Sequence, residues 1–516
     1  MADIVLCTLN ARYSHASLGL RSLLANLGDL RARARLLEFT LGTPLARMLE
    51  ALAAERPRVI GIGVYIWNVE QTLVLVRALR ERLPEARIVL GGPEISHETQ
   101  TQLLTALADH VILGAGERAF ARLAGQLLDG PRPLMKIIPG EDTDPTELAL
   151  PNAFYDADDI AHRHLYLEAS RGCPFKCAFC LSALDRSARP FDPTALADAI
   201  DDLLARGARR FRFVDRTFNL KVANCLSILN RFGDWMRAHP DEPLFLHFEL
   251  IPDRLPQALR EVIASFPVGV LQFEIGVQSF DPRVQAMMDR RQDDAATEAN
   301  LRWLRRHTGA HLHVDLIAGL PGETLAGFGA GFDRLVAMNP HEIQVGLLKR
   351  LRGTPLAARA PSLGLVFETR APYTIVSSPW LSAAEVARLA RFARHWDLIG
   401  NSGRFRRSLP WLLGDAPFER FMALSETLAA RLGRTHGVAY ERWCELVHAH
   451  AATISALAAA AVREDYLASG ASGRPAFLER GIAGRKAGVD RWRATLRDRQ
   501  RTQLVHAPDE RRDAEG

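Results

Sequence analysis

Short apolar runs alternate with amphipathic stretches through the first two thirds of the chain. The runs have the length of strands, and the stretches repeat their apolar residues with the period of a helix. Alternation of this kind predicts parallel sheets covered by helices. Because 516 residues are too many for one hydrophobic core, we expect two or three domains in an α/β protein.

The first third of the chain predicts a doubly wound parallel sheet of the flavodoxin-like kind. Five strands are expected, at Ile4–Leu9, Arg35–Phe39, Val59–Val64, Arg87–Leu90 and Val111–Leu113. Helices are expected near residues 17–28, 44–56, 69–83, 98–108 and 117–128. Ligands of such sheets bind at the carboxyl ends of the strands, where glycine pairs let the backbone approach a large planar or phosphate-bearing ligand.

Three cysteines stand close together in the run Cys-Pro-Phe-Lys-Cys-Ala-Phe-Cys, at Cys173, Cys177 and Cys180. Three thiolates can hold three irons of a [4Fe-4S] cluster and leave the fourth iron open, whereas a cluster that only carries electrons normally has four cysteine ligands. The next cysteine along the chain is Cys225. A zinc knuckle is the alternative, but structural zinc takes four ligands. We therefore interpret the motif as an iron–sulfur site with an open iron.

A second series of strand–helix units follows a proline-rich stretch at about residues 130–159. Its six strands are expected at Leu165–Ser170, Arg210–Val214, Leu244–Glu249, Val268–Gly276, His311–Ile317 and Glu342–Leu348. Together they predict a partial (βα)6 barrel with the cysteines on the loop after its first strand. The strands carry polar residues at alternate positions, which places these residues on one face. Burying them unpaired would cost about 1–3 kcal/mol each, so a ligand-lined interior is the simpler interpretation, with part of the set paired structurally.

The cysteine motif resembles the signature of the radical S-adenosylmethionine (SAM) superfamily. The resemblance implies that the open iron chelates SAM, and that reductive cleavage of SAM gives a 5′-deoxyadenosyl radical. The strand ends around Asp215, Glu274 and Asp315–Glu323 match further motifs of the superfamily. The SAM-binding candidates that follow are Phe179, Asp215, Glu249, Glu274, Gln278, Ser279, Gly319 and Pro321.

The first domain resembles the cobalamin-binding domain that precedes the radical SAM core in one branch of the superfamily. The Gly91-Gly92-Pro93-Glu94 and Gly114-x-Gly116-Glu117 turns carry this resemblance. The cobalamin-binding candidates are Asn10, Arg12, Tyr13, Ser14, Tyr65, Trp67, Gly91, Gly92, Glu94, Gly114, Gly116 and Glu117. An Asp-x-His-x-x-Gly motif is absent, so the resemblance implies no histidine ligand to cobalt, and Tyr65 or Trp67 could face the metal instead. A domain that only buttresses the barrel is the alternative.

Beyond about residue 365 the strand signal fades into helical stretches at Leu381–His395, Pro417–Arg431 and Tyr440–Val462, and the tail Ala507–Gly516 is expected to be disordered. Part of this region resembles a helical domain of unassigned function found behind cobalamin-type radical SAM cores. We expect three domains: a cobalamin-binding-like domain at 1–135, a radical SAM barrel at 150–365 and a helical domain at 366–510.

These features predict a cobalamin-dependent radical SAM enzyme that methylates or rearranges an unactivated carbon. A radical SAM enzyme without cobalamin, such as a methylthiotransferase-like one, and a non-catalytic Fe–S redox protein are the alternatives. A methylthiotransferase would bring three more amino-terminal cysteines, whereas this chain offers only Cys7, which we expect to be a core residue.

Composition limits the partners of the chain. The net charge is +5 and the basic residues are spread evenly, so nucleic-acid binding gets little support. No apolar run reaches membrane-spanning length, the amino terminus lacks the features of a signal peptide, and six cysteines make no disulfide framework. We therefore expect a cytoplasmic protein. The resemblance to radical SAM enzymes implies a small natural-product-like substrate and an external electron donor of the flavodoxin or ferredoxin type.

Overall fold

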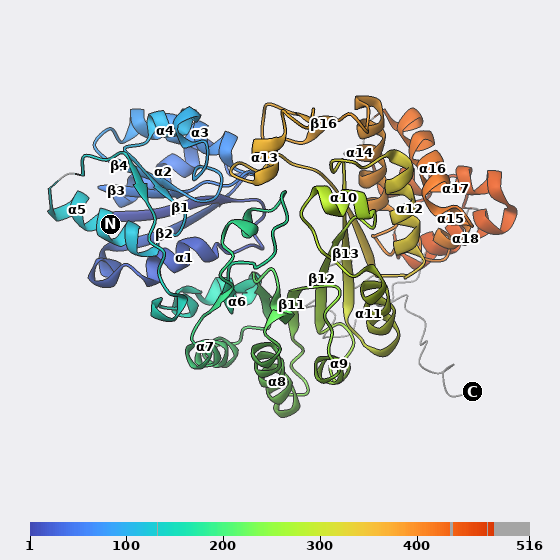
Figure 1. Ribbon diagram of the computed structural model, residues 1–516, viewed down its shortest axis with the longest axis horizontal. Coiled ribbons are helices and arrows are strands. Elements are labelled where there is room, and N and C mark those ends of the chain that lie inside the picture. Colours follow the sequence, from blue (N-terminus) through green and yellow to red (C-terminus); the bar gives the residue numbers. More distant parts are fainter. Residues whose placement is uncertain (132, 434–436, 472, 479–516) are drawn as a thin grey trace. The chain divides into compact units, whose positions relative to one another are not determined.

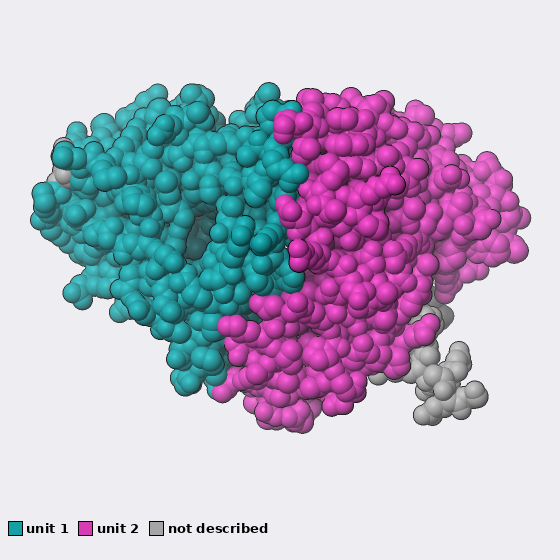
Figure 2. All heavy atoms as spheres, viewed as in Figure 1, with its two compact units in different colours: residues 1–218, 349–361, 367–374 teal, residues 219–348, 362–366, 375–516 magenta. Residues whose placement is uncertain are grey.

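The computed structural model describes residues 1–131, 133–433, 437–471 and 473–478. The chain forms two compact units, drawn in different colours in Figure 2. The first unit comprises Met1–Phe218, Lys349–Pro361 and Phe367–Thr374. The second comprises Asn219–Leu348, Ser362–Val366 and the chain from Ile375 onward.

The first unit contains a six-stranded parallel sheet in the order β2-β1-β3-β4-β5-β6 (Figure 1). Its strands are β1 (Ile4–Asn10), β2 (Ala34–Thr40), β3 (Val59–Gly63), β4 (Arg87–Gly91), β5 (His110–Leu113) and β6 (Ile137–Pro139). Its helices are α1 (Leu18–Ala25), α2 (Leu45–Glu55), α3 (Val69–Arg82), α4 (Leu103–Leu107) and α5 (Glu117–Asp129). Strand β1 pairs with both β2 and β3, so the order reverses there, as in a flavodoxin-like sheet. The predicted doubly wound sheet is confirmed.

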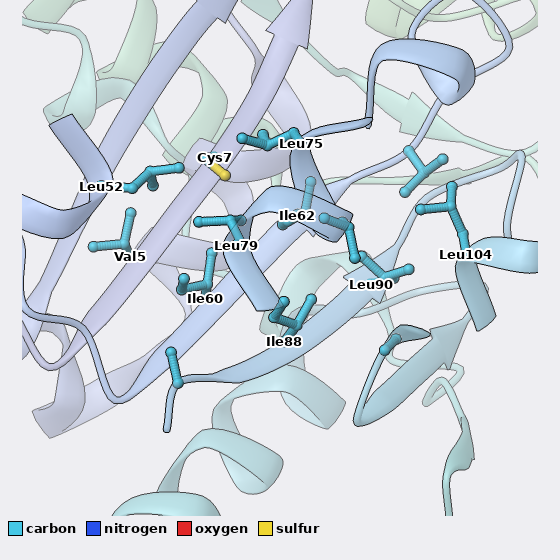
Figure 3. Close-up of a cluster of buried hydrophobic side chains, with 14 of the residues drawn as sticks. Val5, Cys7, Leu52, Ile60, Ile62, Leu75, Leu79, Ile88, Leu90 and Leu104 are labelled. Atoms are coloured by element: carbon cyan, nitrogen blue, oxygen red, sulfur yellow. The ribbon is translucent and has the colours of Figure 1, made fainter. Parts of the chain in front are cut away.

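Strand β1 explains why this sheet needs cover on both faces, because all seven of its residues are buried. Val5, Cys7 and Leu9 face one hydrophobic cluster, whereas Ile4 and Leu6 face another, as the two-residue period of a strand requires. Figure 3 shows Cys7 among leucine and isoleucine side chains of the first cluster. Burial raises the pKa of its thiol to about 12, so Cys7 is the core residue that we expected.

Two elements of this sheet differ from the prediction. The strand β6 lies in the stretch that we expected to separate the domains, where three residues at a sheet edge are too few to show periodicity. The helix expected near 98–108 is shorter, because a 3₁₀ turn at Thr99–Thr101 precedes α4.

The rest of the first unit surrounds the cysteine motif. It includes α6 (Ala157–His162), β7 (Leu165–Leu167), β8 (Ser170–Arg171), β9 (Arg189–Pro190), α7 (Pro193–Ala205), β10 (Arg210–Phe213) and α13 (Pro355–Arg359). Strands β7 and β10 pair in parallel. Helix α7 begins as its sequence predicts, with Pro193 in the first turn and Asp192 accepting a hydrogen bond from the Ala195 amide.

The second unit contains four parallel strands in the order β14-β13-β12-β11. They are β11 (Phe245–Leu250), β12 (Leu271–Gln278), β13 (His311–Ala318) and β14 (Glu342–Leu347). Helix α8 (Val222–Ala238) precedes β11, and helices α9 (Gln257–Ala264), α10 (Pro282–Met287), α11 (Asp294–His307) and α12 (Leu325–Val336) connect the four strands. With β7 and β10, all six strands expected of the second series are present. A second parallel α/β region follows the first, as predicted.

Helices dominate the carboxyl-terminal part of the second unit. They are α14 (Ala383–Leu398), α15 (Leu409–Leu413), α16 (Pro417–Leu432), α17 (Tyr440–Ile454) and α18 (Ala456–Ala468). The single helix expected at Tyr440–Val462 is in fact two, because Ser455 breaks it and caps α18 through its hydroxyl. The tail Ala507–Gly516 lies outside the described residues. Within the described ranges, no helix combines the length and apolarity that crossing a membrane requires.

Candidate functional site

The three motif cysteines lie on a loop that begins directly after β8, and we call residues 173–180 the cluster loop. Gly172 precedes it with a φ of 95°, and a Cβ at this position would lie 2.9 Å from backbone atoms of Asp185 and Ala188. The loop closes on itself, because the Cys173 amide donates to the Asp185 carbonyl at 2.7 Å and the Cys180 amide donates to the Cys177 carbonyl at 3.0 Å. The backbone therefore fixes where the three thiols lie.

The surroundings of the thiols suit a cluster. Cys173 and Cys177 are buried and Cys180 is half-buried. Burial raises the pKa of Cys173, and the neighbouring Cys180 and Cys177 raise it further. The Phe175 amide and Arg216 lower the same pKa, but they do not cancel the rise. Cys173 thus lies within electrostatic reach of the other two thiols. In the described ranges, no three His, Cys, Asp or Glu side chains are arranged to hold one metal ion. A [4Fe-4S] cluster needs no such arrangement, because each cysteine binds a different iron.

A cavity of about 480 Å³ opens at the carboxyl ends of β3, β4 and β5, within the first unit. Glycines from these strand ends form much of its wall, and apolar side chains from α1 and α5 line the side. The lining from the sheet domain includes Gly19, Leu20, Gly61, Gly63, Tyr65, Gly91, Gly92, Ile112, Gly114, Gly116, Glu117 and Phe120. The lining near the cluster loop comprises Glu168, Ser170, Arg171, Gly172, Ser182, Asp185, Val214 and Arg216. The cavity therefore joins the sheet domain to the surroundings of the cluster loop.

Two glycines show why the cavity exists. Gly92 has a φ of 110°, and a Cβ there would lie 2.5 Å from the Val64 carbonyl oxygen. Gly114 has a φ of 69° and faces open space, with no atom within 4 Å of a Cβ built on it. Glycine adopts both backbones without strain. At Gly92 the missing side chain lets the turn pack against the backbone of Val64, whereas at Gly114 it leaves open space.

Charged side chains close the end of the cavity near the cluster loop. Arg171 lies between two carboxylates, 2.9 Å from Glu117 and 2.8 Å from Glu168. Burial raises the pKa of Glu168, although Arg171 opposes this shift. Sequence reasoning named Glu117 as a site candidate. It placed Glu168 only on the polar strand face and Arg216 only in the strand-end motif of Asp215, and it missed Arg171, which stands two residues before Cys173.

Half of the cobalamin-binding candidates line the cavity: Tyr65, Gly91, Gly92, Gly114, Gly116 and Glu117. The other six lie outside its lining. Among them, Asn10 donates to Glu38 at 2.8 Å, Tyr13 bonds to Asp158, and the Ser14 carbonyl accepts from the His164 amide at 2.9 Å. Arg12 is exposed.

Trp67 and Glu94 complete this second group of candidates. Trp67 is 45 % exposed and stacks on Tyr65 with ring centroids 4.4 Å apart, so it presents an aromatic surface next to a cavity residue. Glu94 is buried and accepts hydrogen bonds from Arg352 and Tyr373. Whether either residue touches cobalamin stays a prediction.

The SAM-binding candidates divide between the units. In the first unit, Phe179 is half-buried in the cluster loop, and Asp215 joins the ends of β7 and β10. Its carboxylate accepts from the Ala169 amide at 2.8 Å and from the Ser170 hydroxyl at 2.6 Å. Burial raises the pKa of Asp215 to about 6, although these donors oppose the shift. Both of its oxygens therefore already have protein partners.

The remaining SAM-binding candidates lie in the second unit: Glu249, Glu274, Gln278, Ser279, Gly319 and Pro321. A bulge between Gly276 and Gln278 ends β12, and Gln278 has a φ of 70°. Its Oε1 is buried without a hydrogen-bond partner among the described residues. Strained residues with unsatisfied polar atoms are typical of ligand sites, and the bulge aims Gln278 away from the regular pleat.

The polar face predicted for the second sheet is confirmed by the strand register of this unit. Glu249, Glu274, His313 and Glu342 stand opposite one another across four strands, and His247, Gln272 and His311 form the next row. His247 lies 3.2 Å from Glu274, and His313 lies 3.2 Å from Asp315 and 3.6 Å from Glu342. Burial would lower the pKa of His313, but these carboxylates outweigh it and raise that pKa to about 9. Part of the face is therefore internally paired.

Comparison with known proteins agrees with this arrangement. Three family models match the chain: "B12 binding domain" over residues 4–124, "Radical SAM superfamily" over 167–333 and "Protein of unknown function (DUF4080)" over 362–505. The 2-(S-pantetheinyl)-carbapenam-3-carboxylate methyltransferase of Streptantibioticus cattleyicolor is 24 % identical over 314 residues, which are 55 % of this chain and 46 % of that protein. The cobalamin-dependent radical SAM methyltransferase TokK of Streptomyces tokunonensis is 23 % identical, over 61 % of this chain and 50 % of that protein.

The chain thus spans about half the length of the curated relatives it matches. Among solved structures, the radical SAM methyltransferase TsrM from Kitasatospora setae, with cobalamin and a [4Fe-4S] cluster bound, superposes with a TM-score of 0.58 at 19 % identity. The match covers 84 % of this chain and 99 % of TsrM, and it establishes a common fold. Residues 167–333 of the chain therefore form a radical SAM domain, with a B12 binding domain before it and a DUF4080 domain after it, which is the domain order of the cobalamin-binding branch of radical SAM proteins.

Proposed function

We propose that the protein is a cobalamin-dependent radical SAM enzyme that methylates or rearranges an unactivated carbon of a small molecule. The observation that carries this proposal is the cavity of the first unit, because its wall combines the glycine turns of the B12-binding region with the residues that flank the cluster loop. The relatives named as methyltransferases favour methylation over rearrangement.

The residues of the chain have separable tasks in this proposal. Cys173, Cys177 and Cys180 would hold the cluster, and the glycine turns of the cavity would admit cobalamin. When bound, the cluster, SAM and cobalamin supply reductive cleavage of SAM to a 5′-deoxyadenosyl radical and delivery of a methyl group.

Apolar side chains of the cavity, including Leu20, Ile112 and Phe120, would exclude water from the cofactor surface. The electrons would come from an external donor of the flavodoxin or ferredoxin type, and an oxygen-sensitive cluster suits the cytoplasm.

Anaerobic reconstitution tests the cluster and SAM chemistry. We expect wild-type protein reduced with dithionite to convert SAM to 5′-deoxyadenosine, measured by chromatography. Cys177→Ala should lose this activity and the iron–sulfur absorption. Cys225→Ala is the matched control, because it removes a buried thiol outside the motif and should retain both. A reduced cluster that does not convert SAM to 5′-deoxyadenosine would instead indicate a redox protein.

Incubation with hydroxocobalamin tests the cavity. We expect the wild type to retain corrin absorption after desalting, and Ala115→Trp, which obstructs the cavity, to lose it while still cleaving SAM. Ala106→Trp places the same side chain on the exposed surface of α4 and is the control. If the wild type cleaves SAM but retains no corrin, the protein is a radical SAM enzyme without cobalamin. With cobalamin bound, S-adenosylhomocysteine beside 5′-deoxyadenosine separates methylation from rearrangement.

A further inference from the structure

Two segments from beyond the second sheet belong to the first unit, and we call them the strap. They are Lys349–Pro361, which includes α13, and Phe367–Thr374. The two segments are tied together, because the Arg350 amide donates to the Tyr373 carbonyl at 3.0 Å and Lys349 pairs with Thr374 in an antiparallel bridge. Figure 2 draws the strap in teal with the rest of its unit.

One end of the strap binds the turn that follows β4. Glu94 of this turn is 4 % exposed and accepts from Arg352 Nε and from the Tyr373 hydroxyl, each at 2.8 Å. Arg352 also donates to the Tyr373 oxygen at 3.0 Å and lies 4.8 Å from the centre of its ring. Three side chains thus form a closed triangle of hydrogen bonds around one buried carboxylate.

Further contacts strengthen this attachment. Glu98 accepts hydrogen bonds from both Arg350 and Arg352. Burial alone would raise the pKa of Glu98, but the two guanidinium groups outweigh it and hold that pKa below its ordinary value. Gly353 packs on the ring of His97 so closely that a Cβ would lie 2.2 Å from it. The strap can therefore shift along the turn only by breaking several contacts at once.

The other end of the strap binds the cluster loop. The Leu356 amide donates to the Ala178 carbonyl at 2.9 Å, and Ala178 lies between Cys177 and Phe179. Thr354 caps the start of α13, accepting from the Ala357 amide and donating to the Leu351 carbonyl at 2.7 Å. Only three residues separate Arg352 from Leu356, and the cap orders them, so the two attachments are joined by a short, stiff connection.

We propose that Arg352, Glu94 and Tyr373 are positioning residues that hold the cluster loop in register with the glycine-lined cavity. Gly92, which lines that cavity, precedes Glu94 by two residues in the same turn. The strap thus connects the wall of one cofactor site to the loop that carries the other, through contacts that lie outside the cavity lining. The assignment of the two cofactors rests on the proposed function, whereas the mechanical connection rests on the contacts alone.

Amide hydrogen exchange of the cofactor-free protein tests the connection. We expect Arg352→Ala to accelerate exchange at least tenfold in residues 91–98 and also in the cluster loop, which the strap binds through Leu356. Arg370→Ala is the matched control: it removes an arginine of the same strap whose pair with Glu70 is exposed, and it should change neither region. Acceleration confined to residues 91–98 and 349–354 would overturn the proposal.

A second variant and a second measurement test the same proposal. If Arg352→Ala fails to fold, Tyr373→Phe gives the same comparison, because it deletes only the hydroxyl that Glu94 binds. The second measurement uses protein loaded with cluster and cobalamin and records the magnetic coupling between the reduced cluster and cob(II)alamin. We expect one coupling value in the wild type. At equal cofactor content, Arg352→Ala should show a range of values. Unchanged coupling would overturn the register role, whereas a wild type without bound cobalamin would contradict the proposed function and leave the exchange result standing.

Discussion

Glu323 is a carboxyl group that this fold keeps protonated near neutral pH. It is 2 % exposed, and its Oε2 accepts from the Gly319 amide at 2.9 Å, which closes the turn that carries the SAM-binding candidates Gly319 and Pro321. Burial raises the pKa of Glu323 to about 8, and the hydrogen bonds from the turn only partly oppose this. Folding therefore takes up a proton at pH values between the ordinary pKa of a glutamate and about 8.

This proton makes stability depend on pH. A raised pKa contributes stability that is complete below the ordinary pKa of the unfolded chain and is lost as pH rises through about 8. We predict that the melting temperature of the cofactor-free wild type falls as the pH rises from about 5 to about 8, and that this fall levels off at higher pH. Glu323→Gln keeps the acceptor for Gly319 without the charge, so its melting temperature should fall less. If the melting temperatures of the two proteins fall equally across this pH range, Glu323 is not the group responsible for the fall.

At the residue scale, the sequence predicted chemistry where the signal is local. Cys173, Cys177 and Cys180 lie within eight residues, and the glycine turns after β4 and β5 name the ligand edge of a parallel sheet. The partners of Glu94 could not be predicted in this way. Arg352 and Tyr373 are more than 250 positions away and carry no periodic pattern.

At the scale of elements, strands and helices followed from periodicity and caps. The strand β1 is apolar at every position because both of its faces are covered, and helix α7 begins at an aspartate followed by a proline. The features that the sequence analysis did not predict are ones that periodicity cannot detect. Strand β6 has three residues, and the break at Ser455 interrupts a stretch whose alanines suit a helix on either side.

The cap of α7 gives a prediction at this scale. The Asp192 carboxylate accepts from the Ala195 amide at 2.8 Å, and removing such a cap costs about 1 kcal/mol. Asp192→Ala should therefore lower the free energy of unfolding by about 1 kcal/mol in urea titrations. Asp198→Ala, at an exposed position inside the same helix, is the control and should leave the midpoint nearly unchanged. Equal midpoints for wild type and Asp192→Ala would mean that the cap contributes nothing.

At the scale of the whole molecule, the boundaries of the compact units differ from a division by sequence. The match to the DUF4080 model begins at residue 362, yet Phe367–Thr374 belong to the first unit. A one-dimensional reading assigns each stretch to a single domain, so it could not show that the chain returns to the first unit. The expected domain boundaries at residues 135, 150 and 365 stay predictions.

Exchange of the helical region between relatives would test this organisation. We predict that a chimera joined after residue 374 retains the protection of residues 91–98 from hydrogen exchange, because Tyr373 stays with Glu94. A chimera joined at residue 362 replaces Tyr373 by the relative's residue and should lose protection there unless that residue is also a tyrosine. Equal protection in both chimeras would show that the second strap segment is dispensable.

The strap also bears on how the protein is made. About 150 residues separate Phe218 from Thr374. At roughly 5–20 residues per second, a ribosome therefore needs about 10–30 s to deliver the last part of the first unit. For most of that interval Glu94 has neither Arg352 nor Tyr373, and the Ala178 carbonyl lacks the Leu356 amide as its hydrogen-bond donor. Insertion of iron into a nascent chain would precede the final geometry, so metal delivery should be most productive after translation has passed Thr374.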